Sequence, residues 1–305
     1  MGDFWDDRSA TRRMLGAMLV AVYLIALALA GLALVTRPAS ADTLTAATGY
    51  KLSYDVYKPD SDVKPLPIAV VFMHGKNSTS DTPGMRSFAR SLANEGITVY
   101  EPAMPWSKKW DGTATDATAA LDALVALVAQ PGIKVIVGGQ SMGAAFALAW
   151  RPANPLPGVV GKLFTSPGHM LDTFSPTSPF WNSITPSLNK AKALIAEGKG
   201  ASMTRFEGSN TTGEKLVMES YEMRAEVYAS LHDPETFPSV RKGIAANVLP
   251  VYWGVGSRDP AGGGKKVSFD RMPPNEKSVY SEIPGDHNSI MRDAIPDIVK
   301  WIKGL

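Results

Sequence analysis

Short apolar runs alternate with longer helical patterns along most of this 305-residue chain. Ile68 to Met73 is continuously apolar, which is typical of a central strand that helices cover on both faces. Ile133 to Val137 and Lys162 to Thr165 are further short runs, and an alanine-rich helical pattern from about Ala114 to Ala129 precedes the first of them. Strands that alternate with helices usually lie parallel, so the pattern predicts an α/β fold with a mostly parallel sheet.

Other segments extend the predicted sheet to about eight strands. Apolar and polar residues alternate from Tyr50 to Tyr57, as in a half-buried edge strand, and we expect this strand to run antiparallel to the rest. The remaining segments are strands at 97–100, 250–255 and 278–283, and helices at 83–94, from 144 onward and at 288–302.

The alternation stops between Gly168 and Asn247, in a stretch rich in serine, proline and charged residues. Two helices are predicted there, one from Thr185-Pro186 to Gly198 and one from about Ser220 to Leu231. Because the stretch follows the sixth strand, at 162–165, it is predicted to form a small helical cap over the carboxyl ends of the strands, where open α/β sheets bind ligands. Five side chains are candidates for the apolar wall of the pocket, and core or cap packing is an equal alternative for each: Trp106, His169, Met170, Phe180 and Trp181.

An uncharged apolar run covers residues 14–35 and is long enough to cross a hydrocarbon core about 30 Å thick as a helix. More arginines precede this run than follow it, which favours an N-terminus inside the cytoplasm and a body outside it. The arginines are Arg8, Arg12 and Arg13 before the run and Arg37 after it. The sequence therefore predicts an extracytoplasmic protein.

Two alternatives remain open for residues 1–41. Ala39 and Ala41 have the small-x-small pattern of a signal peptidase site, and cleavage after Ala41 would release a periplasmic or secreted protein. The apolar run is longer than the usual signal-peptide core of about 7 to 15 residues, which favours instead a helix retained as an anchor in the inner membrane. In both cases residues 42–305, with the cap at about 168–247, form the predicted α/β domain.

The segment Gly139-Gln140-Ser141-Met142-Gly143 matches G-x-S-x-G and stands between a predicted strand and a predicted helix. In such a turn the serine has strained backbone geometry, and the two glycines remove side chains that would collide with the neighbouring strand and helix. The N-terminal end of the following helix favours the negative charge that develops on a substrate. Ser141 is therefore the predicted nucleophile.

A serine hydroxyl needs a base to accept its proton, and the chain has four histidines. His287 is the predicted base, because its loop leaves the last strand and opens onto the same edge of the sheet as Ser141. His169 is a candidate for the pocket lining. His232 ends a predicted cap helix, and we expect it to be solvated or to lie at the C-terminal end of that helix.

Asp259 is the predicted carboxylate that fixes the tautomer of His287, because it follows the strand at 250–255. It also gives the chain order Ser, Asp, His that accompanies a serine nucleophile on a strand-to-helix turn. Asp172, shortly after the sixth strand, is the reserve candidate. Asp286 is adjacent to the histidine in sequence, so the two side chains would diverge in an extended loop.

The loop His74-Gly75-Lys76-Asn77 follows the strand at 68–73 and supplies the predicted oxyanion hole. Its donors are expected to be the backbone N–H groups of Lys76 and of Met142, the residue after the nucleophile. We expect His74 to brace this loop rather than to titrate during catalysis.

The body of the chain, from about Tyr50 to Leu305, resembles the α/β-hydrolase superfamily, nearer to the serine aminopeptidase S33 and monoacylglycerol-lipase-like branch. The resemblance rests on the His74-Gly75 loop, the Ser141-Met142-Gly143 elbow and the insert after the sixth strand, while Gln140 stands where many members have histidine. It implies the α/β-hydrolase fold and a serine hydrolase of the carboxylesterase or lipase type. Such an enzyme cleaves an ester, amide or thioester of a small or lipid-like substrate through an acyl-enzyme, without a cofactor.

Composition excludes several classes of binding partner and of reactive site. The 31 basic and 29 acidic residues give a net charge of +2 without long like-charged blocks, so no nucleic-acid partner is expected. The absence of cysteine excludes disulfides, thiolate metal sites and a cysteine nucleophile. We expect a small-molecule ester or acyl substrate, and membrane contact through residues 14–35 if they are retained. An acyltransferase of the same fold and a non-catalytic binding domain in the cell envelope remain alternatives.

Overall fold

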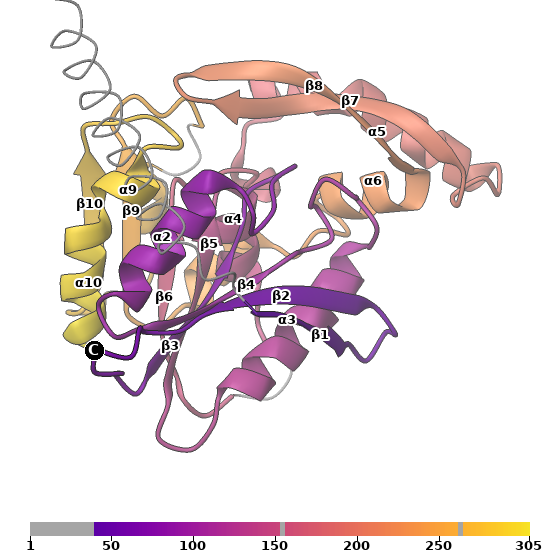
Figure 1. Cartoon of the computed structure of the whole chain (residues 1–305). Coiled ribbons are helices and arrows are strands. Elements are labelled where there is room, and N and C mark those ends of the chain that lie inside the picture. The colour runs from indigo at the N-terminus through magenta and orange to yellow at the C-terminus, as the bar shows by residue number, and fades with distance from the viewer. Residues whose placement is uncertain (1–39, 153–155, 262–264) are drawn as a thin grey trace, which may run out of the picture. The chain divides into compact units, whose positions relative to one another are not determined.

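The computed structural model describes residues 40–152, 156–261 and 265–305. Within these ranges eight strands form one sheet in the order β1-β2-β4-β3-β5-β6-β9-β10 (Figure 1). The first two pairings, β1 with β2 and β2 with β4, are antiparallel, and the others are parallel, which confirms the predicted sheet. The strands are β1 (Ser40–Thr45), β2 (Lys51–Tyr57), β3 (Ile68–Met73), β4 (Thr98–Pro102), β5 (Lys134–Gln140), β6 (Val159–Thr165), β9 (Val251–Gly256) and β10 (Val279–Ile283).

The edge strand β1 is not among the predicted strands. It pairs with β2 from Ser40 opposite Val56 to Thr45 opposite Lys51. Cleavage after Ala41 would therefore remove Ser40 and Ala41 from this strand. The predicted membrane-spanning run at residues 14–35 lies outside the described residues, and no helix within them is long and apolar enough to cross a bilayer.

Helices cover both faces of the sheet. On one face α2 (Pro83–Ala93) packs against α9 (Ile290–Asp293) and α10 (Ile295–Lys303), and these three segments lie together in Figure 1. The other face is covered by α3 (Ala114–Val128), α4 (Met142–Ala149) and α7 (Val240–Ala246). The helix predicted at 288–302 is divided in two, because Pro296 lacks the N–H that would continue α9 and instead stands in the first turn of α10.

The core follows the alternation of side chains along the central strands. All six residues of β3 are buried. Phe72 lies 4.4 Å from Phe88 of α2, ring centre to ring centre, while Val71 and Met73 belong to the core that includes α3 and α4. This burial from both sides confirms the prediction for the continuously apolar run at 68–73.

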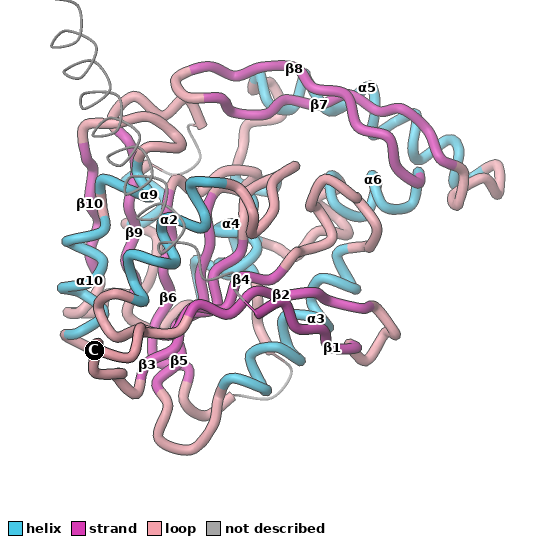
Figure 2. The backbone as a smooth tube through the Cα atoms, viewed as in Figure 1, coloured by secondary structure: helices cyan, strands magenta, loops and turns pink. Residues whose placement is uncertain are grey.

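The segment between β6 and β9, called the cap below, contains a hairpin as well as helices. Its elements are the short 3-10 helix η1 (Leu171–Thr173), α5 (Pro179–Ala196), β7 (Met203–Thr212), β8 (Lys215–Arg224), α6 (Ala225–His232) and α7. Figure 2 shows the two long hairpin strands side by side above the main sheet. A further short helix, α8 (Lys266–Phe269), follows β9.

Both predicted cap helices differ from the observed ones. The helix predicted to begin at Thr185-Pro186 begins at Pro179, where the hydroxyl of Ser178 accepts a hydrogen bond from Trp181 N at 3.2 Å, and Pro186 lies inside the helix. The helix predicted from Ser220 is wrong over its first part, because residues 215–224 pair with β7 around a turn at Gly213. Gly213 has φ of 58°, a conformation that glycine adopts readily.

Candidate active site

Ser141 occupies the corner between β5 and α4, in a conformation that few residues other than glycine adopt. Its φ is 55° and its ψ is −114°, a geometry that costs on the order of 1 to 3 kcal/mol and persists only where packing fixes it. A Cβ on Gly139 would lie 2.6 Å from the carbonyl oxygen of Met73, and one on Gly143 would overlap the same oxygen. Two glycines are therefore required for the corner to approach β3 so closely.

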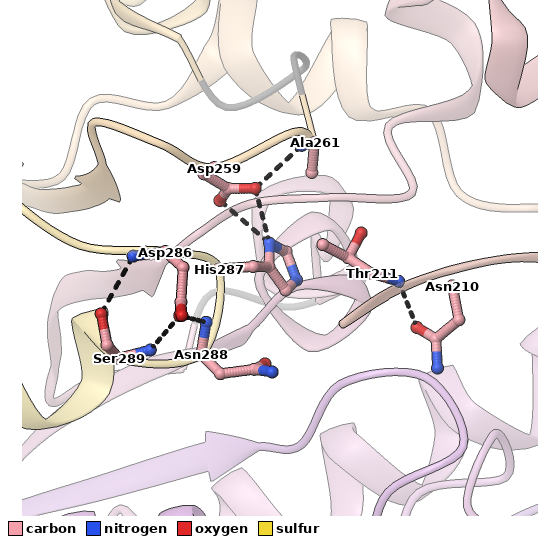
Figure 3. Close-up of polar contacts among 8 residues, drawn as sticks. All are labelled: Asn210, Thr211, Asp259, Ala261, Asp286, His287, Asn288 and Ser289. Carbon is pink, nitrogen blue, oxygen red and sulfur yellow. Dashed lines mark hydrogen bonds and ion pairs between the residues drawn. The ribbon is translucent and has the colours of Figure 1, made fainter. Parts of the chain in front are cut away.

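Asp259 and His287 come together from the loops that follow β9 and β10. The imidazole Nδ1 lies 2.9 Å from each carboxylate oxygen of Asp259, and the two side chains point toward one another in Figure 3. The side chain of His287 is only 3% exposed and that of Asp259 only 7%. The backbone N–H of Ala261 also donates to Asp259 Oδ1 at 2.8 Å. A proton on Nδ1 donates to the carboxylate, so Nε2 is left as a proton acceptor.

The serine hydroxyl and the imidazole face the same small space beside Gly168. A Cβ on this glycine would lie 3.1 Å from Ser141 Oγ and 3.7 Å from His287 Cε1. The backbone N–H of Gly168 also donates to Ser141 O at 3.2 Å. The structure thus brings Ser141, Asp259 and His287 together, from three places far apart in the chain.

The other two aspartates considered as partners of His287 form hydrogen bonds elsewhere. Asp172 accepts hydrogen bonds from the backbone N–H of Arg241 at 3.2 Å and from the Ser239 hydroxyl, at the beginning of α7. Asp286 accepts from the backbone N–H groups of Ser289 and Asn288 within its own loop, and these bonds hold its pKa below the ordinary value. Figure 3 shows this turn beside the histidine.

The loop after β3 lies directly against the nucleophile. A Cβ on Gly75 would lie 3.2 Å from Ser141 Cβ and would overlap the side chain of Gln140. His74 braces the loop, because its Nδ1 donates to Gly75 O at 2.8 Å while its Nε2 accepts from Met104 N at 3.0 Å. Burial lowers the pKa of His74 to about 4, so the ring is neutral at physiological pH. These contacts fix the loop in which the backbone N–H of Lys76 is a predicted oxyanion donor. The other predicted donor, Met142, directly follows Ser141 as the first residue of α4.

The side chain of Lys76 has a role that the sequence did not indicate. Its ammonium group donates to the backbone carbonyl of Ser209 in β7 and lies 5.5 Å from the ring centre of Tyr221 in β8. Burial lowers the pKa of Lys76 to about 8, and the carboxylate of Glu219 opposes this effect. Because these partners lie more than 130 residues away in sequence, no local pattern could have identified the contact.

A cavity of about 510 Å³ extends from Ser141 beneath the cap. Its polar wall includes the Lys76, His169 and Asn210 positions, and its apolar wall includes Phe174, Phe180 and Leu216. The full lining is Lys76, Ser141, Gly168, His169, Phe174, Ser178, Pro179, Phe180, Ser209, Asn210, Thr211, Leu216, Pro260 and Ala261. The cavity can therefore accept an apolar group and place a few polar atoms against it.

Two of the five predicted wall residues, His169 and Phe180, line this cavity. Trp106 is instead fully buried beneath the loop at residues 74–77, called the oxyanion loop below after its predicted role, where its indole N–H donates to His74 O at 2.9 Å. Met170 is buried in the core, and Trp181 lines a separate surface hollow next to Leu171 and Arg241. These three residues follow the packing alternative, because bulky side chains near a site also fill the core and the cap.

His232 is the last residue of α6, as the second of its two predicted placements had it, and it is buried rather than solvated. Its Nδ1 donates to Tyr228 O at 3.0 Å, and its ring stacks on Tyr228 with centres 4.1 Å apart. His169 donates through Nε2 to Leu231 O at 2.7 Å, and burial lowers its pKa to about 3. Burial also lowers the pKa of His232, so both rings are neutral packing groups under the cap. Within the described ranges, no three acidic or histidine side chains gather as a metal ion would require.

Comparison with known proteins yields matches in structure rather than in sequence. The sequence matches no family model and no curated protein. Monoglyceride lipase from Saccharomyces cerevisiae, solved as a soluble variant with a substrate analogue, has a TM-score of 0.65 at 14% identity, over 88% of this chain and 96% of that one. Monoacylglycerol lipase from Paleococcus ferrophilus has a TM-score of 0.60 at 17% identity, over 84% and 99%. A thermostable carboxyl esterase from Bacillus coagulans, in complex with glycerol, has a TM-score of 0.58 at 14% identity, over 88% and 99%.

Proposed function

We propose that this chain, which has the α/β-hydrolase fold, is a serine hydrolase that cleaves a carboxylic ester of a small or lipid-like substrate through an acyl-enzyme. One observation carries the proposal. The Ser141 hydroxyl and the His287 imidazole face one space beside Gly168, and Nδ1 of that imidazole is bonded to a buried carboxylate. The structural neighbours, which are lipases and esterases, support the same reaction class.

In the proposed mechanism His287 Nε2 accepts the hydroxyl proton as Ser141 Oγ attacks the carbonyl carbon. The negative oxygen of the tetrahedral intermediate is stabilised by the backbone N–H groups of Met142 and Lys76. Asp259 stabilises the imidazolium, which then donates its proton to the departing alcohol. Water attacks the acyl-enzyme with the same base, and the acid and the free serine are released.

The cavity supports an acyl group as the part of the substrate that the cap selects. Its aromatic and aliphatic wall offers burial to a hydrocarbon chain, which stabilises binding by about 0.8 kcal/mol for each methylene group that leaves water. Amides, thioesters and transfer to an alcohol use the same residues. Product analysis with competing alcohols distinguishes transfer from hydrolysis, because only a transferase forms the new ester in preference to the acid.

Labelling of the protein with a fluorophosphonate probe tests the nucleophile. We expect the wild type to be labelled and Ser141→Ala to be unlabelled, with hydrolysis of p-nitrophenyl esters reduced by about 10³-fold or more. Ser87→Ala, an exposed serine on α2, is the matched control and should label like the wild type. A series of acyl-chain lengths then identifies the preferred chain. Absence of labelling and turnover in the wild type would contradict the proposal and favour a non-catalytic binding domain.

A further inference from the structure

The hairpin β7–β8 contacts both sides of the nucleophile. On the oxyanion side the Lys76 ammonium donates to Ser209 O of β7, and Asn77 Nδ2 donates to Glu219 Oε2 of β8 at 3.2 Å. On the histidine side the backbone N–H of His287 donates to Gly213 O, in the hairpin turn, at 3.3 Å. In Figure 1 the hairpin lies beyond the end of the sheet at which α4 begins. The hairpin therefore connects the two loops between which a substrate carbonyl would react.

Glu219 is the centre of the contacts on the oxyanion side. Its Oε2 accepts from Asn77 Nδ2 at 3.2 Å, from Asn210 Nδ2 at 3.0 Å and from the Tyr221 hydroxyl at 3.1 Å. Asn210 and Tyr221 belong to the hairpin itself, whereas Asn77 belongs to the oxyanion loop. Hydrogen bonds to an ionised acceptor are about twice as strong as those between neutral groups. The carboxylate thus joins the hairpin to the loop.

The hydrogen bond between Asn77 and Glu219 supports the backbone conformation of the oxyanion loop. Asn77 directly follows Lys76 and has φ of 55°, a left-handed conformation that needs support from its surroundings. Its backbone N–H donates to Trp106 O at 3.0 Å, and its side chain is held by Glu219. The Lys76 side chain is attracted to the same carboxylate. Contacts with the cap therefore hold both Lys76 and Asn77 in place.

We propose that Glu219 is a positioning residue for the reaction, which holds the oxyanion loop so that the Lys76 N–H faces the reacting carbonyl. This inference rests on the proposed function. It assigns the hairpin a part in transition-state stabilisation, in addition to covering the cavity. Oxyanion donors must be preorganised to be effective, so a loop that is released at Asn77 stabilises the transition state less well.

The test compares Glu219→Ala and Glu219→Gln with Glu222→Ala, an exposed glutamate on the same strand. The substrate is p-nitrophenyl acetate, whose two-carbon acyl group offers the cap little surface to contact. We expect Glu219→Ala to lower kcat by about 10-fold or more, with KM changed by less than about 3-fold, and to slow fluorophosphonate labelling by a similar factor. Glu219→Gln keeps an oxygen acceptor for Asn77 and should recover part of the loss. Glu222→Ala should behave like the wild type.

Several outcomes separate this inference from the proposed function. A wild type without labelling or turnover contradicts the proposed function, whereas an active wild type with an equally active Glu219→Ala contradicts only the role of Glu219. An increase in KM alone, with kcat unchanged, also overturns the inference, because it indicates substrate contact. If Glu219→Ala fails to fold, Asn77→Ala removes the other partner of the same bond and must reproduce the loss in kcat.

Discussion

Glu101 is a carboxyl group that the fold removes completely from water. It lies near the end of β4, opposite Asp55 of β2, and is 0% exposed. Burial raises the pKa of Glu101 well above its ordinary value of 4.5, and the nearby Asp55 adds to the effect. The side chain is therefore held as a neutral acid inside the fold.

This raised pKa makes the stability of the protein depend on pH. The contribution of neutral Glu101 is fully present below about pH 4.5 and is lost as the pH rises through the folded-state pKa, because the unfolded chain then ionises more readily. Glu101→Gln keeps the shape without the ionisation. We expect its free energy of unfolding, relative to the wild type, to increase between pH 4 and pH 9 by on the order of 1 to 3 kcal/mol.

Urea unfolding at several pH values measures this difference. Glu222→Gln, an exposed position, is the control and should show little change at any pH. A difference between Glu101→Gln and the wild type that stays constant from pH 4 to pH 9 would show that Glu101 ionises as readily in the folded protein as in the unfolded chain, and would contradict the raised pKa.

At the scale of the residue, the order of motifs along the chain constrains which side chains can meet. The G-x-S-x-G motif and the loops after the last two strands indicated Ser141, Asp259 and His287, and the structure places the three side chains together. The roles of the Lys76 side chain and of Glu219 could not be predicted, because both depend on a contact across the cap.

The hairpin shows what periodicity misses at the scale of an element. Residues 220–231 contain a helical pattern only in their second part, whereas buried Tyr221 and Met223 alternate with exposed Ser220 and Glu222, as in a strand with one covered face. The adjacent α6 was predicted because its apolar side chains recur at helical spacing. Strand and helix follow each other without a glycine or proline between them, so the sequence contains no signal for the boundary.

The turn of the hairpin is held to the loop that carries Asp259. Glu214 forms an ion pair with Arg258, the residue before that aspartate, and both side chains are more than half exposed. An exposed pair of this kind contributes about 0 to 1 kcal/mol to stability, so Glu214→Ala should change the melting temperature very little. We expect it to lower kcat for p-nitrophenyl acetate by about 2- to 10-fold, because the turn also holds the backbone of His287.

Glu197→Ala is the matched control for this prediction. Glu197 forms a similarly exposed ion pair with Lys199 at the end of α5. Its removal should leave both kcat and the melting temperature unchanged. If the two variants have equal kcat, the hairpin turn does not influence His287, the proposed base.

At the scale of the whole molecule, the sheet could be predicted almost completely. Continuous apolar runs indicated buried parallel strands, and the alternating run at 50–57 indicated an antiparallel strand near the edge. The exception is β1, whose six residues include few apolar side chains and follow the N-terminal apolar run directly. Its pairing depends on the backbone of β2, which residue pattern alone does not reveal.

We propose an extracytoplasmic location for the whole domain, because the apolar run at 14–35 is preceded by more arginines than follow it. Alkaline phosphatase fused after Leu305 should be active in a bacterial host, since this enzyme folds only outside the cytoplasm. A mature N-terminus at Asp42 would indicate cleavage, and an intact N-terminus in the membrane fraction would indicate an anchor. An inactive fusion, with an active control carrying a known export signal, would contradict the proposal.

The small space beside Gly168 restricts the position of the reacting atom more than it restricts the size of the ligand. A single carbon there touches both the serine oxygen and the imidazole, so the atom under attack must fit where glycine leaves room. The rest of the substrate occupies a chamber many times larger than a methyl group. Under the proposed function, reshaping that chamber would change which acyl chains fit, while a side chain at residue 168 would crowd the Ser141 hydroxyl and should slow the turnover of all of them.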